Sequence, residues 1–225
     1  MKTFILLTGK QWHDELFNQL KSSKDQNWIR ISNKEEFTLE NLTLIEPDKI
    51  FIPHWSNIII PEIFNRFECF VFHMTDLPFG RGGSPLQNLI KLGLRNTKIS
   101  ALKVGKGIDD GPIYLKRDLS LEGTALQIFQ RAAEVILEMI AHIILYDPAP
   151  VPQSGEVTLF KRRTLEQSDI TPIEGIIELY DHIRMLDCIG YPAAYLETHN
   201  FRFEFSEVSK EKSNELKAHV RIIKK

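Results

Sequence analysis

Short apolar runs alternate along this chain with segments whose apolar residues recur at helical spacing. Residues 4–7 form a four-residue apolar run, and the segment 12–20 then places Leu16, Phe17 and Leu20 on one face. This order predicts a buried strand followed by an amphipathic helix. The opening run is shorter than the apolar core of a secretion signal, so we interpret it as a strand.

The same alternation continues toward residue 145. The run at residues 68–72 is apolar throughout, which is typical of a parallel strand covered on both faces. Such an order of elements fits an open, mostly parallel Rossmann-like α/β sheet, in which ligands lie beyond the carboxyl ends of the strands. We therefore expect the polar loops 73–85 and 105–112 to project into that crevice. The other predicted strands are 28–31, 49–53, 98–104 and 113–115. The other predicted helices are a short one that opens at 58–61, and the segments 86–92 and 125–145.

A Pro-rich stretch divides the chain into two predicted parts. Residues 147–152 contain three prolines, which indicates an extended linker. We expect an α/β domain over residues 1–150, and a linker with a small C-terminal α+β appendage over residues 151–225. The appendage is predicted from a helical pattern near residues 174–186 and from alternating residues at 201–205.

Composition and charge narrow the class of protein. The 225 residues carry 28 Lys+Arg and 30 Asp+Glu, a formal net charge of −2, which disfavours a nucleic-acid partner. Cys69 and Cys188 lie among apolar neighbours and are too few for a disulfide framework, so we expect reduced thiols in a cytoplasmic protein. The apolar segment 132–145 is interrupted by Glu134 and Glu138, which predicts no membrane span. No Cys/His spacing indicates a metal site.

Three features could carry chemistry. His73 directly follows the apolar run and precedes a glycine-rich loop, where a neutral imidazole could accept a proton; a histidine bonded inside a turn is an equally good interpretation. Asp109 or Asp110 could orient that imidazole, although taken alone each is more simply a turn-capping residue. Arg81 and the loop up to Pro85 could hold an anion, without the spacing of a nucleotide-binding motif.

The combination resembles a known family. After the strand that delivers His73 come Pro78 and the sequence Arg-Gly-Gly-Ser-Pro, and about 25 residues later Ile-Asp-Asp-Gly-Pro-Ile. These segments are similar to the formyltransferase family that uses N10-formyltetrahydrofolate, whose usual text is Asn-x-His-Pro-Ser-Leu-Leu-Pro, Arg-Gly and Leu/Val-Asp-x-Gly-Pro-Ile. The resemblance covers roughly residues 45–205. It implies a formyltransferase in which His73 and Asp109 are the catalytic histidine and aspartate.

One position departs from the family pattern. Val71 stands where the family has a catalytic Asn, whose amide helps to bind the formyl oxygen as it becomes an oxyanion. Loss of such a donor costs on the order of 10²–10³ in rate. The available substitutes are Thr75, Asn57 and a backbone N–H of residues 80–83.

Within the family, residues 72–90 resemble most the sugar N-formyltransferases of the pseudaminic acid pathway (PseJ-like). This implies transfer of the formyl group to the 4-amino group of a UDP-linked 4-amino-4,6-dideoxy-N-acetyl hexosamine of the L-AltNAc type, by a protein that could form a homodimer. The alternatives are a methionyl-tRNA formyltransferase, which the net charge and the small C-terminal part disfavour, and a non-catalytic folate or nucleotide-sugar binding module, which Val71 favours.

The resemblance also implies two sets of binding residues. The flat pterin ring of the folate suits apolar and main-chain walls, which two loops could supply. The residues expected to contact the sugar or its diphosphate are Arg81, Gly82, Gly83, Ser84, Gln87, Asn88, Lys10 and Tyr191. Those expected to contact the folate are Trp55, Ser56, Ile59, Ile60, Val104, Gly107, Ile108 and Asp110.

Overall fold

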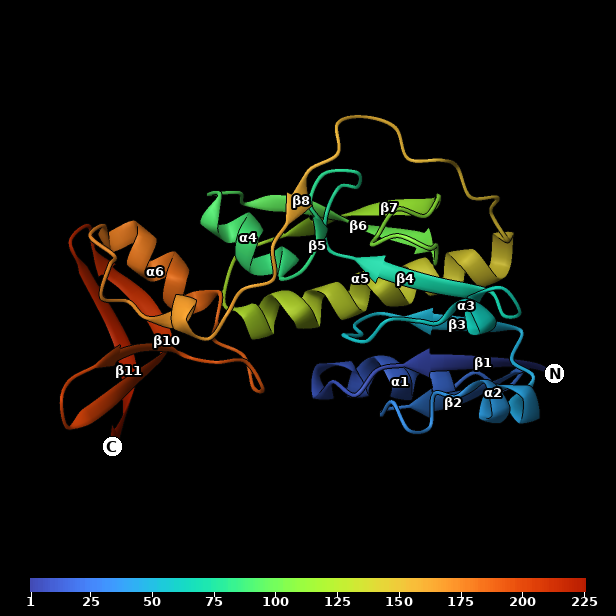
Figure 1. Cartoon of the computed structure of the whole chain (residues 1–225), viewed down its shortest axis with the longest axis horizontal. Coiled ribbons are helices and arrows are strands. Elements are labelled where there is room, and N and C mark those ends of the chain that lie inside the picture. The colour runs from blue at the N-terminus through green and yellow to red at the C-terminus, as the bar shows by residue number, and fades with distance from the viewer. The chain divides into compact units, whose positions relative to one another are not determined.

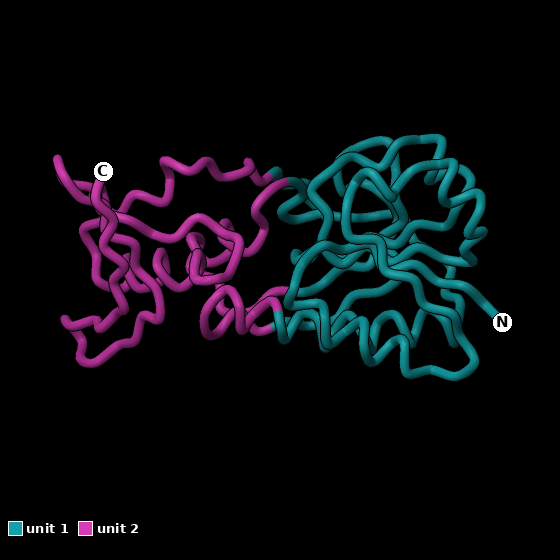
Figure 2. Tube along the Cα trace, turned by 90° about the horizontal axis from the view of Figure 1, so that it is seen from below, with its two compact units in different colours: residues 1–82, 98–119, 130–159 teal, residues 83–97, 120–129, 160–225 magenta.

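The structure, a computed structural model, describes all 225 residues and divides into two compact units that are interleaved along the sequence (Figures 1 and 2). Unit 1 comprises residues 1–82, 98–119 and 130–159, and unit 2 comprises residues 83–97, 120–129 and 160–225. This division differs from a single boundary at residue 150, because the chain enters unit 2 three times.

A six-stranded sheet has the order β2-β1-β3-β4-β6-β7. The first four strands in the sequence pair in parallel, whereas β6 runs antiparallel to β4. The predicted fold class, an open and mostly parallel α/β sheet, is therefore confirmed. The strands are β1 (Lys2–Leu7), β2 (Gln26–Ile31), β3 (Lys49–Ile52), β4 (Cys69–His73), β6 (Asn96–Lys103) and β7 (Ile113–Ser120).

Both faces of this sheet are covered by apolar side chains. Ile5 and Ile50 belong to a buried cluster that includes residues of α2 and α3, while Phe51 and Phe70 stack at a ring-centroid distance of 5.1 Å. Successive residues of a strand point to opposite faces, so a strand buried on both faces is apolar throughout. This explains the unbroken apolar runs of the sequence.

Six α-helices and two short 3-10 helices accompany the strands. Helix α5 buries Ile136, Met139, Ile140 and Ile143, which recur at helical spacing. None of the helices combines the length and the apolar character that a membrane crossing requires. The helices are η1 (Gln11–His13), α1 (Asp14–Lys21), α2 (Leu39–Ile45), α3 (Pro61–Phe64), α4 (Pro85–Lys91), α5 (Ala125–Tyr146), η2 (Glu166–Ser168) and α6 (Ile176–Arg184).

The direction of β6 changes the course of the loop that follows it. Val104 donates its N–H to the carbonyl of Cys69 at 3.2 Å, so this loop leaves the sheet beside the first residue of β4, whereas His73 is the last residue of that strand. The expectation that this loop starts at the carboxyl ends of parallel strands is therefore wrong, because β6 is antiparallel. The loop has to fold back to approach His73.

The Pro-rich segment after α5 is bonded to unit 1. Val151 and Ile113 exchange two backbone hydrogen bonds of 2.8 and 2.9 Å, and Arg81 donates its N–H to the carbonyl of Thr158 at 3.0 Å. The short strands β5 (Arg81–Gly82) and β8 (Leu159–Phe160) pair with each other. The segment predicted as a linker is thus an ordered, extended strap.

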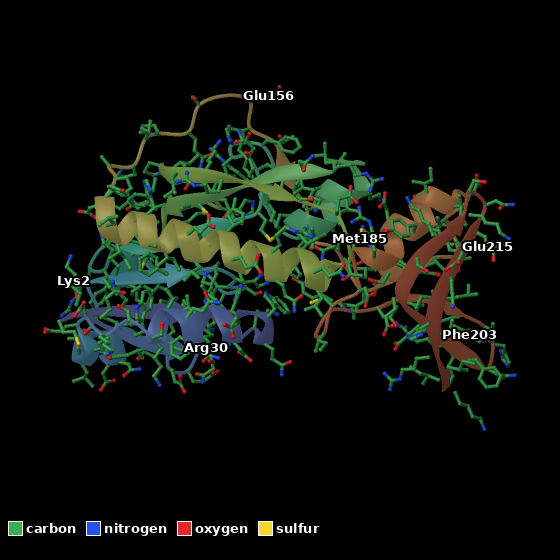
Figure 3. All side chains as sticks on the ribbon, turned by 180° about the vertical axis from the view of Figure 1, so that it is seen from behind. Lys2, Arg30, Glu156, Met185, Phe203 and Glu215 are labelled. Atoms are coloured by element: carbon green, nitrogen blue, oxygen red, sulfur yellow. The ribbon has the colours of Figure 1, made fainter.

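Unit 2 contains an antiparallel sheet of the order β11-β10-β9, against which α6 packs, so the predicted α+β appendage is confirmed. Phe203 of β10 lies opposite Leu196 and Ile222 on the neighbouring strands (Figure 3). Arg184 is only 1% exposed and donates from Nε to the Asp181 carboxylate at 2.6 Å, which pairs the buried charge with an opposite one. The strands are β9 (Ala194–Glu197), β10 (Phe201–Lys212) and β11 (Glu215–Lys224).

A buried histidine makes the stability of the fold depend on pH. Burial lowers the pKa of His13 from 6.5 to about 3, with contributions from the nearby His54, Arg30 and Lys10. The unfolded state therefore binds the proton more strongly, so the stability is fully present above pH 6.5 and is lost as the pH falls toward 3. We therefore expect the free energy of unfolding to be about 2 kcal/mol lower at pH 5 than at pH 7.5 because of this histidine.

The measurement is urea unfolding of the wild type and of His13→Gln at pH 7.5 and pH 5. Glutamine does not titrate and can still bond the Thr8 hydroxyl, which lies 2.8 Å from Nδ1 of His13. The change in unfolding free energy between the two pH values should be smaller in the variant by about 2 kcal/mol. An identical pH dependence in both proteins would show that His13 is not the titrating group.

Candidate functional site

The imidazole of His73 is held in one orientation at the end of β4. The residue is 7% exposed, and its Nε2 lies 2.8 Å from the carbonyl oxygen of Gly80. A carbonyl can only accept, so Nε2 carries the proton and donates it to this bond. In the neutral ring the basic nitrogen is therefore Nδ1.

Asp109 faces that basic nitrogen. Its Oδ2 lies 3.5 Å from Nδ1 of His73 and accepts the backbone N–H of Gly82 at 2.9 Å. If Nδ1 takes up a proton, the carboxylate stabilises the resulting imidazolium. The structure thus brings together the two residues that the sequence proposed as a catalytic pair, although they belong to different loops.

The loop that carries Asp109 is tightly folded. Asp109 has a φ of 50°, the left-handed region that side-chain-bearing residues rarely adopt. A Cβ on Gly111 would lie 1.8 Å from the carbonyl oxygen of Lys103, and one on Gly107 would lie 2.3 Å from the carboxylate of Asp110. Glycine is therefore required at position 111, where the neighbouring atom belongs to the backbone, whereas at position 107 the exposed Asp110 side chain could move aside.

One side chain that sequence reasoning did not single out joins the two loops. Gln153 Oε1 accepts from Nε of Arg81 at 3.1 Å and from its Nη2 at 2.8 Å. Its Nε2 donates to the carbonyl oxygens of Asp109 and Gly111, both at 2.8 Å. A lone glutamine after a Pro-rich stretch carries no sequence signal for such a role.

The proposed replacements for the missing Asn donor lie apart from one another. Thr75 is fully buried, and its hydroxyl donates to the carbonyl of Gly80 at 3.4 Å. Asn57 is exposed in the segment between β3 and α3. Val71 lies on the same face of β4 as His73 and packs against the apolar cluster around Ile50. The position beside His73 is therefore apolar.

The residues proposed to contact the folate fall into two groups. Trp55, Ile59 and Val104 are partly buried, and each packs against the apolar cluster that contains Ile50. Ile60 and Ile108 are 45% and 74% exposed, which is unusual for large apolar side chains. The remaining three, Ser56, Gly107 and Asp110, are exposed.

Several residues proposed to contact a sugar serve internal structure in unit 2. Asn88 Nδ2 donates to the carbonyl of Gly83 at 3.1 Å and to that of Ser84 at 2.9 Å, and Gln87 donates to a backbone carbonyl at 3.1 Å. Burial raises the pKa of the Tyr191 hydroxyl, and its ring stacks on another aromatic ring. These polar groups hold backbone segments together.

The other proposed sugar contacts lie in unit 1. Arg81 and Gly82 form β5, and both bond to the Asp109 loop or to Gln153. Lys10 is half-buried, and its Nζ lies 5.2 Å from the centre of the Trp12 ring. No group of three or more His, Cys, Asp and Glu side chains gathers as metal ligands.

Comparison with known proteins finds similarity to methionyl-tRNA formyltransferases. The family described as "Methionyl-tRNA formyltransferase, C-terminal domain" matches residues 165–223. The solved structure of a methionyl-tRNA formyltransferase from Clostridium thermocellum is 48% identical, covers 100% of both chains and superposes with a TM-score of 0.96. The methionyl-tRNA formyltransferase of Thermosipho melanesiensis is 28% identical over 167 residues, which are 68% of this chain.

Two further facts limit and redirect the comparison. The chain spans about half the length of the curated relatives it matches, 54% in the case of the Thermosipho protein. The formyltransferase PseJ from Anoxybacillus kamchatkensis, solved with UDP-4,6-dideoxy-4-formamido-L-AltNAc and tetrahydrofolate, is 20% identical and superposes with a TM-score of only 0.60 over 73% of this chain and 88% of its own.

The prediction of a UDP-amino sugar as acceptor is therefore wrong, and so is the exclusion of a nucleic-acid partner. Identity of 48% with a methionyl-tRNA formyltransferase over the full length outweighs the similarity of one short segment, residues 72–90, to the sugar N-formyltransferases. The physical reason is that the segments that carried the resemblance, around His73, Arg81 and Asp109, are joined to one another by hydrogen bonds inside unit 1. These internal bonds carry no information about an acceptor.

A substitution at Gly111 tests how tightly the Asp109 loop packs against β6. In Gly111→Ala the new methyl group would overlap the carbonyl of Lys103, so the loop or β6 has to move. We expect a loss of about 2 kcal/mol or more in unfolding free energy, and faster hydrogen exchange at residues 104–112. Gly175→Ala is the matched control, because the nearest atom to its Cβ is 3.8 Å away and its φ is −92°. Equal behaviour of the two variants would contradict the tight packing.

Proposed function

This chain belongs to the formyltransferase family, and from this premise we propose that it transfers a formyl group from N10-formyltetrahydrofolate to the amino group of methionyl-tRNA. Family membership rests on the 48% identity with the Clostridium thermocellum protein over the whole of both chains. The observation that carries the proposed chemistry is the distance of 3.5 Å between Nδ1 of His73 and Oδ2 of Asp109.

In this proposal His73 moves a proton between the two amines of the reaction. An amine that attacks the formyl carbon has to lose a proton, and the lone pair of Nδ1 accepts it while the Asp109 carboxylate stabilises the imidazolium. The same Nδ1–H then returns the proton to the departing nitrogen, so the ring ends the cycle neutral. The bond from Nε2 to the Gly80 carbonyl keeps the ring oriented throughout.

The folate supplies the formyl carbon in this reaction, and the chain offers surfaces that suit it. Ile60 and Ile108 expose large apolar side chains on the two segments that also carry Trp55, Ile59 and Val104, which pack against the core cluster. Apolar walls of this kind favour a flat, uncharged ring such as a pterin over water. These five residues are the ones we propose to hold it.

Local charge supports a tRNA acceptor in spite of the net charge of −2. Residues 216–225 carry four Lys and Arg residues and no acidic residue, and Lys217, Arg221 and Lys224 are exposed on β11. Phosphate binding depends mainly on the cations that reach the backbone of the nucleic acid. Among these cations, Arg221 also lies 3.6 Å from the Glu204 carboxylate. This strand lies within the segment that matches the C-terminal domain of methionyl-tRNA formyltransferases.

The direct test is incubation of the purified protein with N10-formyltetrahydrofolate and methionyl-tRNA. We expect N-formylmethionyl-tRNA, detected after hydrolysis as formylmethionine by mass spectrometry. Raising the salt from 50 to 200 mM should lower kcat/KM by about 10- to 100-fold, as expected for roughly four phosphate contacts. Absence of formylmethionine at low salt would rule out this acceptor.

Two substitutions test the roles of the catalytic pair. Asp109→Asn keeps an acceptor for the Gly82 N–H but removes the charge, and His73→Asn removes the base. Each should lower kcat by about 100-fold or more, because general base catalysis and its stabilisation contribute about that much. Asp118→Asn, an exposed carboxylate on β7, is the control and should retain wild-type kcat. Wild-type turnover in either site variant with an unchanged melting temperature would refute the assigned roles.

A further inference from the structure

Gln153 uses all the hydrogen-bonding capacity of its side-chain amide within one site. An amide has two N–H donors and two oxygen lone pairs, and here both donors reach carbonyl oxygens while the oxygen receives two guanidinium N–H groups. The orientation of the amide is set by its partners. If it were flipped, its NH₂ group would face the donors of Arg81 and its oxygen would face the carbonyls of Asp109 and Gly111.

The two carbonyls that Gln153 binds flank the turn that presents Asp109. The left-handed backbone of Asp109, with a φ of 50°, is strained for a residue that carries a side chain and persists only where surrounding contacts hold it. Gln153 binds the carbonyl of this residue and that of Gly111, at 2.8 Å each, while Gly82 binds its carboxylate. The peptide backbone and the side chain of Asp109 are thus held separately.

The chain delivers Gln153 to this place with little freedom. Pro148, Pro150 and Pro152 restrict the backbone of the strap just before it. Val151 forms two backbone hydrogen bonds with Ile113, the first residue of β7. The residue next to these restraints is therefore fixed relative to the strand that follows the Asp109 loop.

We propose that Gln153 is a positioning residue for formyl transfer, which acts by holding Asp109 against Nδ1 of His73. The proposal rests on the proposed function. Gln153 itself touches neither of the two catalytic side chains, since its bonds go to backbone carbonyls and to Arg81. Its effect on the reaction passes through the geometry of Asp109, and displacement of a catalytic group by about 1 Å can cost about 100-fold in rate.

Two variants separate the two ends of the amide. Gln153→Ala removes every bond. Gln153→Glu keeps an acceptor for Arg81 but has no donor for the carbonyls of Asp109 and Gly111. Both variants should lower kcat by about 10- to 100-fold with KM for both substrates changed by less than about 3-fold. A kcat for Gln153→Glu within about 2-fold of the wild type would overturn the proposal, since the bonds to the carbonyls would then be dispensable.

A double substitution shows whether the effect passes through Asp109. In an Asp109→Asn background, Gln153→Ala should reduce the remaining kcat, followed over long incubations, by less than about 2-fold, because the charge that Gln153 positions is already gone. A full multiplicative loss would overturn the proposal. Gln26→Ala is the matched control: Gln26 is half-buried, accepts one bond from Trp28 and lies on β2, so it should leave kcat unchanged.

The experiment distinguishes the two proposals. A wild-type protein that does not formylate methionyl-tRNA refutes the proposed function and with it the role of Gln153. An active wild type with active Gln153 variants refutes the role of Gln153 alone. Melting temperatures measured in parallel identify a variant that has lost its fold. If Gln153→Ala or Gln153→Glu is unfolded, the kcat of the other variant tests the role of Gln153.

Discussion

Asp109 is held by contacts from three separate stretches of the chain, and the chemistry proposed for the site depends on them. The Gly82 N–H binds the carboxylate, Gln153 binds the backbone carbonyl, and Nδ1 of His73 lies 3.5 Å away. The left-handed backbone at this residue is costly in isolation. The loop glycines and the Pro-rich strap are the parts of the local structure that stabilise this backbone conformation.

A second constraint fixes the tautomer of His73, the histidine proposed as the catalytic base. Because Nε2 donates to the Gly80 carbonyl, the basic nitrogen has to be the one that faces Asp109. Val71 beside it is apolar, so it offers no side-chain amide to the oxyanion of the proposed reaction. In that proposal the imidazolium formed on proton transfer is stabilised by the Asp109 carboxylate, which faces Nδ1.

The proposed tRNA acceptor shows that the net charge of a whole chain is a poor guide to nucleic-acid binding. A net charge of −2 disfavours nonspecific phosphate binding by the molecule as a whole, yet the last ten residues carry four cations and no acid. Counterion release depends on the cations at the contact. Likewise, Gln87 and Asn88 follow the family motif directly, but their amides bind backbone carbonyls in unit 2. Position after a motif does not establish contact with a substrate.

The sequence by itself determined the succession of strands and helices, the α/β class of the sheet, and the pairing of His73 with Asp109 in a formyltransferase pattern. Periodicity and short motifs are local, so they can be read without the fold. Only the tertiary structure decided that β6 is antiparallel, that the loop after it folds back to His73, and that the Gln153 amide binds the backbone of that loop. The direction of β6 depends on backbone hydrogen bonds, and every residue except proline offers the same backbone carbonyl and N–H groups, so such bonds leave no mark in the sequence. The bond from Gln153 joins its side chain to the backbone of a residue 44 positions earlier, which only the fold brings close.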